Sequence, residues 1–173
     1  MNKKKGLFIS FEGPEASGKS SQILLLQKYL TTKKISFITT REPGGTKLAE
    51  SLRNLILKIK SDINIDEEIL MLMAARSHHI NNVIKPALDK SNLVISDRFA
   101  DSTFVYQGYV NNFGIQKAKS LHKNILNNFL PHKTFLFNLS SSKIIARLKK
   151  RKSKNKYDKL ERNFHDQVNR GYE

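Results

Sequence analysis

The stretch FEGPEASGKS, Phe11–Ser20, decides the fold of this chain. The apolar run Leu7–Ile9 precedes it, and apolar residues at helical spacing follow it across Gln22–Leu30. Its pattern Gly-x-x-x-x-Gly-Lys-Ser points backbone N–H groups at a phosphate, and the positive end of the next helix adds to the attraction. The order strand, loop, helix therefore predicts a phosphate-binding loop rather than a chance glycine-rich turn. Lys19 would reach the β- and γ-phosphates of a nucleotide, and the Ser20 hydroxyl would ligate Mg²⁺.

The composition is that of one globular domain with an excess of positive charge. The chain has 173 residues, 39% of them hydrophobic, and a net charge of +16. Such a field attracts nucleotides, nucleic acid or anionic membrane, but the lysines are scattered, which fits a solvated surface at least as well as a nucleic-acid patch. No apolar segment approaches the roughly 20 residues of a membrane helix, so no membrane partner is expected. The lack of cysteine excludes disulfides and thiolate metal sites and suits a cytoplasmic protein.

Short apolar strands alternate with amphipathic helices along the chain. Strands are predicted at 6–11, Ile35–Thr40, Leu93–Ile95 and Thr134–Leu139. Helices are predicted from Gln22, Lys47 and Asp66, across Gln116–Phe129, after Ser140 or Ser141, and from Leu160. In the helix that Asp66 is expected to cap, we expect Leu70 to face the core and Pro86 to disturb the helix. The alternation predicts a three-layer α/β fold with a mainly parallel sheet, in one domain spanning residues 1–173.

Polar side chains follow each predicted strand. Glu12 ends the first strand, Arg41 and Glu42 follow the second, and Asp97 and Arg98 follow the third. Since ligands collect at the carboxyl ends of parallel strands, these groups are expected to converge on one site. Asp97 is placed to hold Mg²⁺ or its water shell, although taken alone it fits a turn aspartate equally well.

A second anion site is predicted beside the phosphate loop. Arg98 should point away from Asp97, because neighbouring side chains at a strand end alternate, and it would then face a phosphate acceptor. Arg53 and Arg76 lie on helices otherwise built for burial, and an arginine binds a phosphate in bidentate fashion. Each alone fits a surface ion pair better, but the three together favour an anion site.

A series of segments in this order resembles the thymidylate kinase family: FEGPEASGKS, TREPGGT, LAESLR, AARSHH, VISDRFADST and VYQG. The likeness runs from Leu7 to about Tyr172. It implies a P-loop NTPase fold and the Mg²⁺-dependent transfer of the ATP γ-phosphoryl group to dTMP, giving dTDP and ADP for dTTP synthesis. It also implies a homodimer in the cytoplasm, with small-molecule nucleotides as partners and no specific nucleic acid.

The resemblance assigns roles residue by residue. ATP binding falls on the loop and the start of the next helix: Gly13, Pro14, Glu15, Ala16, Ser17, Gly18, Lys19, Ser20 and Ser21. The dTMP side falls on Glu15, Glu42, Arg53, Leu72, Arg76, Arg98, Thr103 and Gln107. Of these, Glu42, Arg53, Arg76 and Arg98 would hold the monophosphate, and Thr103 and Gln107 would meet thymine. Catalytic roles fall on Lys19, Asp97, Arg98 and Arg151, and the metal ligands are Ser20 and Asp97.

The resemblance also predicts a lid. One branch of the family carries a catalytic arginine in the phosphate loop, where this chain has Ala16, so the chain resembles the bacterial branch, whose arginine comes from the lid. The expected lid is a basic segment near residues 147–160 with Arg147, Lys149 and Arg151. Arg147 and Arg151 are four residues apart and hence on one helical face. Without the resemblance, this segment fits a solvated basic loop.

The chain departs from the family pattern at two places, which leave alternatives open. Leu72 stands where the family has a Phe that stacks on thymine, so aliphatic contact replaces stacking. The family's C-terminal strand and helix, which help to hold adenine, are missing from this sequence. The alternatives are therefore a P-loop kinase for another nucleotide or nucleoside, or an inactive truncated nucleotide-binding fragment. A basic nucleic-acid-binding protein is a more distant alternative, because no aromatic residues interleave a basic stripe.

Overall fold

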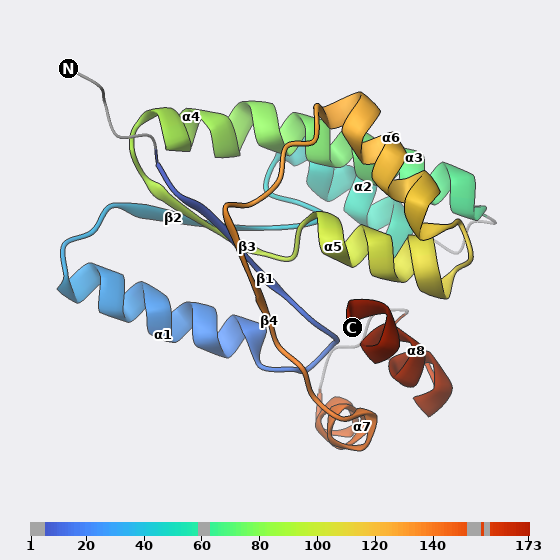
Figure 1. Ribbon diagram of the computed structural model, residues 1–173. Coiled ribbons are helices and arrows are strands. Elements are labelled where there is room, and N and C mark those ends of the chain that lie inside the picture. Colours follow the sequence, from blue (N-terminus) through green and yellow to red (C-terminus); the bar gives the residue numbers. More distant parts are fainter. Residues whose placement is uncertain (1–5, 59–62, 152–156, 158–159) are drawn as a thin grey trace.

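A parallel sheet organises the molecule (Figure 1). The computed structural model describes residues 6–58, 63–151, 157 and 160–173. Four strands, in the order β2-β3-β1-β4, form the sheet. They are β1 (Phe8–Glu12), β2 (Phe37–Arg41), β3 (Leu93–Asp97) and β4 (Lys133–Leu136). All neighbouring pairs are parallel, which confirms the predicted α/β class with a mainly parallel sheet.

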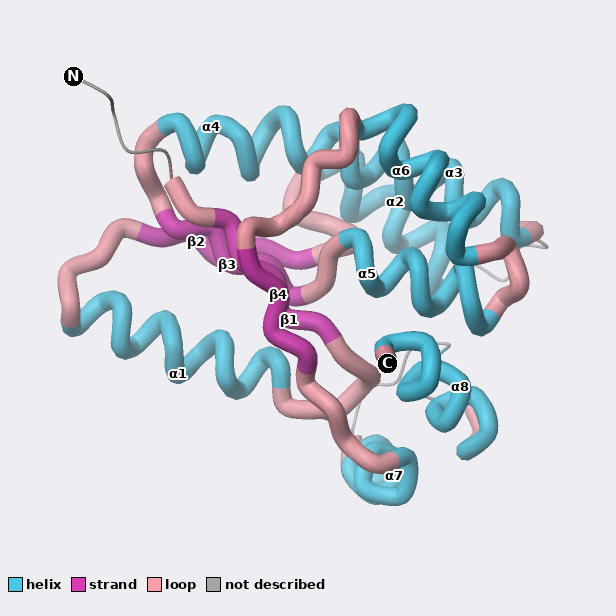
Figure 2. Tube along the Cα trace, viewed as in Figure 1, coloured by secondary structure: helices cyan, strands magenta, loops and turns pink. Residues whose placement is uncertain are grey.

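Helices cover both faces of the sheet, as the cyan and magenta tubes of Figure 2 show. They are α1 (Lys19–Thr32), α2 (Lys47–Lys58), α3 (Ile65–His79), α4 (Lys85–Asp89), α5 (Ala100–Thr103), α6 (Ile115–Leu126), α7 (Ser141–Lys149) and α8 (Arg162–Tyr172). Helix α1 lies on one face and α2 to α6 lie on the other, while α7 and α8 lie beside the carboxyl ends of the strands (Figure 1). No helix in the described part of the chain combines the length and apolar character needed to cross a bilayer.

The two faces of β1 and β3 supply separate parts of the core. Phe8 and Val94 point into a cluster with α3, α4 and α6, and both are fully buried. Ile9 and Ile95 point the other way, into a cluster with α1. Successive side chains of a strand alternate between its faces, so apolar residues at consecutive positions are what a strand covered on both faces requires.

The strand register lines up the polar strand ends. Asp97 pairs with Phe11 of β1 and with Arg41 of β2. The three strands therefore end at one level, and the residues that follow them, Glu12 and Arg98 among them, enter the same region. This is the convergence that the sequence predicts.

Several local details differ from the sequence predictions. Asn64, not Asp66, caps α3: its side chain accepts from the Glu67 N–H at 2.9 Å, and its own N–H donates to the Glu67 carboxylate at 2.9 Å. This capping box satisfies two backbone groups at once, which a cap at Asp66 would not. Leu70 is 53% exposed instead of facing the core. The disturbance predicted at Pro86 does occur: α3 gives way to a π-helical turn, Ile80–Ile84, which leads into α4 with Pro86 at its start.

The region after β4 differs as well. The strand ends at Leu136 rather than at Leu139, and it forms the edge of the sheet. Ser140 precedes α7, but its hydroxyl lies against the hydroxyl of Ser142 and makes no capping hydrogen bond. The predicted charged segment beyond Lys149 lies largely outside the described residues, since 152–156 and 158–159 are not described.

Candidate active site

The loop between β1 and α1 has the backbone that a phosphate cradle needs. Gly13 has φ 133°, and a Cβ there would collide with the carbonyl oxygen of Phe137, so only glycine fits. Gly18, with φ 105°, leads directly into α1. Ala16 adopts φ 54°, a left-handed conformation that costs an alanine about 1–2 kcal/mol. The N-terminus of α1 therefore opens onto the loop, as a phosphate site requires.

Lys19, the first residue of α1, holds its ammonium group inside this loop. Only 6% of the residue is exposed. Nζ donates to the carbonyl oxygen of Gly13 at 2.9 Å and to that of Pro14 at 2.7 Å. Burial, followed by the charge of Arg98, lowers the pKa of Lys19 to about 7. An anion that binds in the loop would therefore stabilise the charged form of Lys19.

Ser20 and Asp97 form an oxygen pair at the mouth of the loop. The Ser20 hydroxyl donates to Oδ2 of Asp97 at 2.9 Å. Among the described residues, no group of three or more His, Cys, Asp and Glu side chains could hold a metal by itself. Mg²⁺ keeps several waters and takes oxygen ligands from substrate phosphates, so it needs only one or two protein oxygens. The hydroxyl and the carboxylate fit this requirement.

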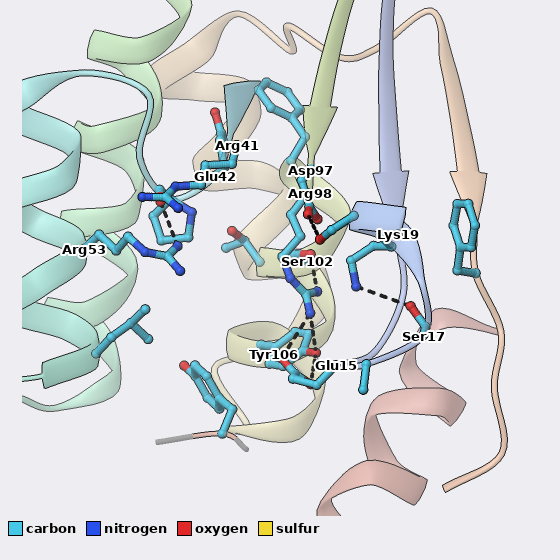
Figure 3. Close-up of a pocket in the computed structure, with 18 of the residues that line it drawn as sticks. Glu15, Ser17, Lys19, Arg41, Glu42, Arg53, Asp97, Arg98, Ser102 and Tyr106 are labelled. Atoms are coloured by element: carbon cyan, nitrogen blue, oxygen red, sulfur yellow. Dashed lines mark hydrogen bonds and ion pairs between the residues drawn. The ribbon is translucent and has the colours of Figure 1, made fainter. Parts of the chain in front are cut away.

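Arg98 is the centre of a hydrogen-bond network at the end of β3 (Figure 3). Nη2 donates to Glu15 Oε1 at 3.0 Å and to the Tyr106 hydroxyl at 3.2 Å. Nη1 donates to Ser102 Oγ at 3.0 Å and to the Tyr172 hydroxyl at 3.1 Å. The guanidinium is thus held in place beside the phosphate loop. Arg98 has φ 72°, so it lies outside the strand, and it contacts a different set of residues from Asp97, which accepts from Ser20.

Arg76 reaches the same region from α3 and is almost fully buried. Its Nε donates to Glu42 Oε2 at 2.6 Å, and its Nη2 donates to Thr103 Oγ1 at 2.7 Å. The other carboxylate oxygen of Glu42 contacts His79 Nδ1 at 2.9 Å. Within the described part of the chain, the buried Nη1 of Arg76 has no hydrogen-bond partner. A buried donor without a partner is costly, so this group lowers the stability of the folded chain.

A single cavity of about 830 Å³ joins these features. It is lined by every predicted ATP-, acceptor- and metal-binding residue except Gly13 and Pro14, whose carbonyls contact Lys19 instead. Arg53 enters it from α2, where its Nη1 donates to the carbonyl oxygen of Pro43 at 2.8 Å (Figure 3). Leu72 is 6% exposed and contributes an apolar wall.

The predicted lid arginines also face the cavity. Nη1 of Arg147 donates to the carbonyl oxygen of Ala16 at 2.8 Å, which ties α7 to the phosphate loop. Arg151 lines the cavity although α7 ends at Lys149, so the two arginines meet the site without sharing a continuous helix. Lys149 is exposed and is not part of the cavity wall.

Sequence reasoning missed several groups that hold the site together. Ser102 and Tyr106 contact Arg98, and the hydroxyl of Tyr106 donates to Glu15 at 2.7 Å. Their helical spacing with Thr103 and Gln107, which puts all of these on one face, is a signal that would have found them. The contact between Tyr172 and Arg98 carries no such signal, because 74 positions separate the two.

Comparisons with known proteins agree with this geometry. A family model described as thymidylate kinase matches residues 11–173. A thymidylate kinase of Mycoplasma capricolum is 41% identical over 169 residues, covering 96% of this chain and 79% of the relative. One of Ruthia magnifica is 40% identical over 170 residues, covering 98% of this chain and 83% of the relative.

A solved structure agrees as well. The crystal structure of thymidylate kinase from Ehrlichia chaffeensis is 32% identical in sequence and superimposes with a TM-score of 0.76, covering 97% of this chain and 85% of that one. Both the phosphate loop and the arginine-lined wall opposite it fall within the matched residues. On the sequence match, the fold and the site together, this chain belongs to the thymidylate kinase family.

Proposed function

We propose that this chain transfers the γ-phosphoryl group of ATP to dTMP, giving dTDP and ADP, with Mg²⁺ as the metal ion. The observation that carries the proposal is that two sets of cationic side chains face one cavity. Lys19 stands on the phosphate loop, and Arg53, Arg76 and Arg98 stand across from it. A kinase with a phosphate acceptor must bring two polyanions together, and such an arrangement offsets their repulsion.

The donor side rests on the phosphate loop. Backbone N–H groups and Lys19 would hold the β- and γ-phosphates, and Ser20 with Asp97 would hold Mg²⁺. The bound ion would neutralise charge on the phosphate oxygens. Arg147 contacts the loop at Ala16, so the first residue of the predicted lid is next to the phosphate loop.

The acceptor side rests on the three arginines and on the groups that hold them. Arg98 and Arg53 would bind the monophosphate, Glu15 would approach the sugar, and Arg76, Thr103 and Gln107 would meet the base beside Leu72. Arg76 is one of the residues that line the cavity. Its fixed orientation, set by Glu42 and Thr103, supplies the preorganisation that such a site needs.

The reaction needs no general base. An oxygen of the dTMP phosphate is already anionic, so it can attack the γ-phosphorus while the bond to the ADP oxygen breaks. No proton has to move. The work of the protein is to align the two oxygens and to stabilise charge on the transferred group. We assign this role to Lys19, Arg98 and Arg151, which all line the cavity.

A comparison of acceptors tests the proposal. We expect ADP release to be fastest with dTMP when dTMP, dUMP, dCMP and AMP are offered at equal concentration with ATP and Mg²⁺. Leu72 in place of an aromatic stacking partner weakens contact with any base but leaves the polar groups unchanged. The absence of a dTMP preference would instead support a kinase for another nucleotide.

The affinity for ATP should depend on pH through Lys19. The pKa of Lys19 is lowered to about 7, so above pH 7 the free protein holds a neutral amine and must take up a proton to bind phosphate. We expect the affinity to fall by up to about tenfold per pH unit from about pH 7.5 to about pH 9. Calorimetry in buffers of different ionisation enthalpy would detect the proton uptake. An affinity that stays constant over this range would contradict the prediction.

Arg151 should act mainly on turnover. We expect Arg151→Ala to lower kcat about a hundredfold while changing the Kd for ATP by less than about threefold, because a lid arginine stabilises charge that develops in the transition state. Lys150→Ala, an exposed neighbour, is the matched control and should change neither. Equal losses in kcat and affinity would shift the role to Arg147 or Lys149.

We also propose, from the family resemblance, that the chain acts as one kinase domain, as a homodimer in the cytoplasm and without a specific nucleic-acid partner. Sedimentation at concentrations near those of the assay tests the homodimer.

A further inference from the structure

A buried carboxylate stands behind the part of the cavity assigned to the base. Glu68 of α3 is only 6% exposed and does not line the cavity. Its Oε1 accepts from Gln107 Nε2 at 2.7 Å and from the Tyr157 hydroxyl at 2.9 Å. Gln107 and Tyr157 both line the cavity, so Glu68 lies behind the cavity wall and contacts two of the residues that form it.

This contact fixes which end of the Gln107 amide faces Glu68. An amide can turn by half a rotation and exchange its NH₂ donor for its carbonyl acceptor, but an ionised carboxylate only accepts. The NH₂ group must therefore face Glu68, since the reverse orientation would place two acceptor oxygens against each other in a buried place. The carbonyl oxygen is left for a ligand, and within the described part of the chain it has no hydrogen-bond partner.

The fixed acceptor alone distinguishes between the pyrimidine bases. Gln107 lies in the π-helical segment Phe104–Val110, which follows α5 directly. An acceptor oxygen matches the imide edge of thymine or uracil, where the ring nitrogen between the two carbonyl groups carries a hydrogen. Cytosine has an unprotonated ring nitrogen at the same position, so two acceptors would face each other.

We propose that Glu68 is a positioning residue for base selection. It holds Gln107 so that the cavity presents an acceptor to the base, and the site then favours imide pyrimidines over cytosine. The proposal rests on the proposed function, because it concerns the acceptor side of the same cavity. The 5-methyl group is not part of this selection, so dUMP should be treated like dTMP by these two residues.

The test is the ratio of kcat/KM for dTMP to kcat/KM for dCMP. In Glu68→Gln, the neutral amide can face Gln107 with either its NH₂ or its carbonyl, so Gln107 is no longer held in one orientation. We expect the ratio to fall by about tenfold or more, since one mispaired buried hydrogen bond is enough for that. The ratio of dTMP to dUMP should stay unchanged. A general loss of activity would instead lower kcat/KM for dTMP, dUMP and dCMP by the same factor.

An exchange of the two side chains provides the rescue. In the double variant Glu68→Gln with Gln107→Glu, the amide is at position 68 and donates to the carboxylate at position 107. That carboxylate offers only acceptor oxygens to the base, as the held amide of Gln107 does in the unaltered chain. The ratio of dTMP to dCMP should return toward that of the unaltered chain. Asp66→Asn, which removes a charge from the exposed first turn of the same helix, is the matched control and should leave the ratio unchanged.

The outcomes separate the two proposals. An unaltered chain that does not phosphorylate dTMP would refute the proposed function. An active unaltered chain, with equal losses for dTMP and dCMP in Glu68→Gln and no rescue in the double variant, would overturn only the role of Glu68. If Glu68→Gln does not fold, Glu68→Asp, which keeps the charge but withdraws it by one methylene, should show a smaller fall in the ratio, and an unchanged ratio would overturn the proposal.

Discussion

We expect Lys19→Met to lower kcat for phosphoryl transfer by about a thousandfold, the upper end of what removal of one preorganised donor costs. Lys19 is the ammonium inside the phosphate loop, 6% exposed and bonded to the carbonyls of Gly13 and Pro14. Methionine keeps the length and apolar stem of the side chain but removes the charge. Steady-state kinetics with ATP and dTMP would measure the effect.

Lys28→Met is the matched control for this variant. Lys28 lies on the same helix, α1, but is exposed, so the same substitution should leave kcat within about twofold. Thermal unfolding of both variants would show whether the fold is intact. A fall in kcat of less than tenfold in a folded Lys19→Met would contradict the role assigned to the loop.

We expect Glu42→Ala to lower the free energy of unfolding by about 3–5 kcal/mol, because it leaves the buried guanidinium of Arg76 without its charged partner. Glu42 is 4% exposed and accepts from Arg76 at 2.6 Å and from His79 at 2.9 Å. Urea unfolding at neutral pH would measure the loss. Glu50→Ala provides the control, since Glu50 pairs with Arg41 at 2.9 Å in an exposed place and should cost less than about 1 kcal/mol.

The effect of Glu42 should also depend on pH. Burial alone would raise the pKa of Glu42, but the charge of Arg76 and the hydrogen bond from His79 outweigh it and lower the pKa below 4.5. A carboxyl with a lowered folded-state pKa stabilises the protein above its unfolded pKa and loses this contribution as the pH falls through the folded value. The difference in the free energy of unfolding between the unaltered chain and Glu42→Ala should therefore become smaller as the pH falls. Equal losses for Glu42→Ala and Glu50→Ala at neutral pH would contradict the account of this cluster.

Local patterns predicted the parts of the site that follow directly from a strand or a loop. The phosphate loop has a motif with a physical cause, and Asp97 and Arg98 come directly after an apolar strand. In a parallel sheet that is enough to place them at the same edge as Ser20, where the structure puts them. Arg76 could be predicted as a site residue because an arginine on an otherwise apolar helix face is unusual.

The parts that could not be predicted depend on contacts between distant segments. Tyr172 of α8 donates to Glu12 across 160 positions, and Tyr157 reaches Glu68 across 89. The local sequence pattern cannot predict such a pairing, since it depends on where α8 and Tyr157 lie in the folded chain. The helix start at Asn64 was missed for a simpler reason: three acidic residues follow it in the first turn, and any of several polar side chains there could cap.

If one cavity holds ATP on the phosphate loop and a nucleoside monophosphate on the arginines opposite, ADP release must depend on the acceptor. Chromatographic detection of dTDP from dTMP, ATP and Mg²⁺, alongside ADP release measured with and without dTMP, tests this. We expect dTDP and ADP in equal amounts and little ADP when dTMP is absent. ADP release that does not depend on dTMP, with no dTDP formed, would contradict it.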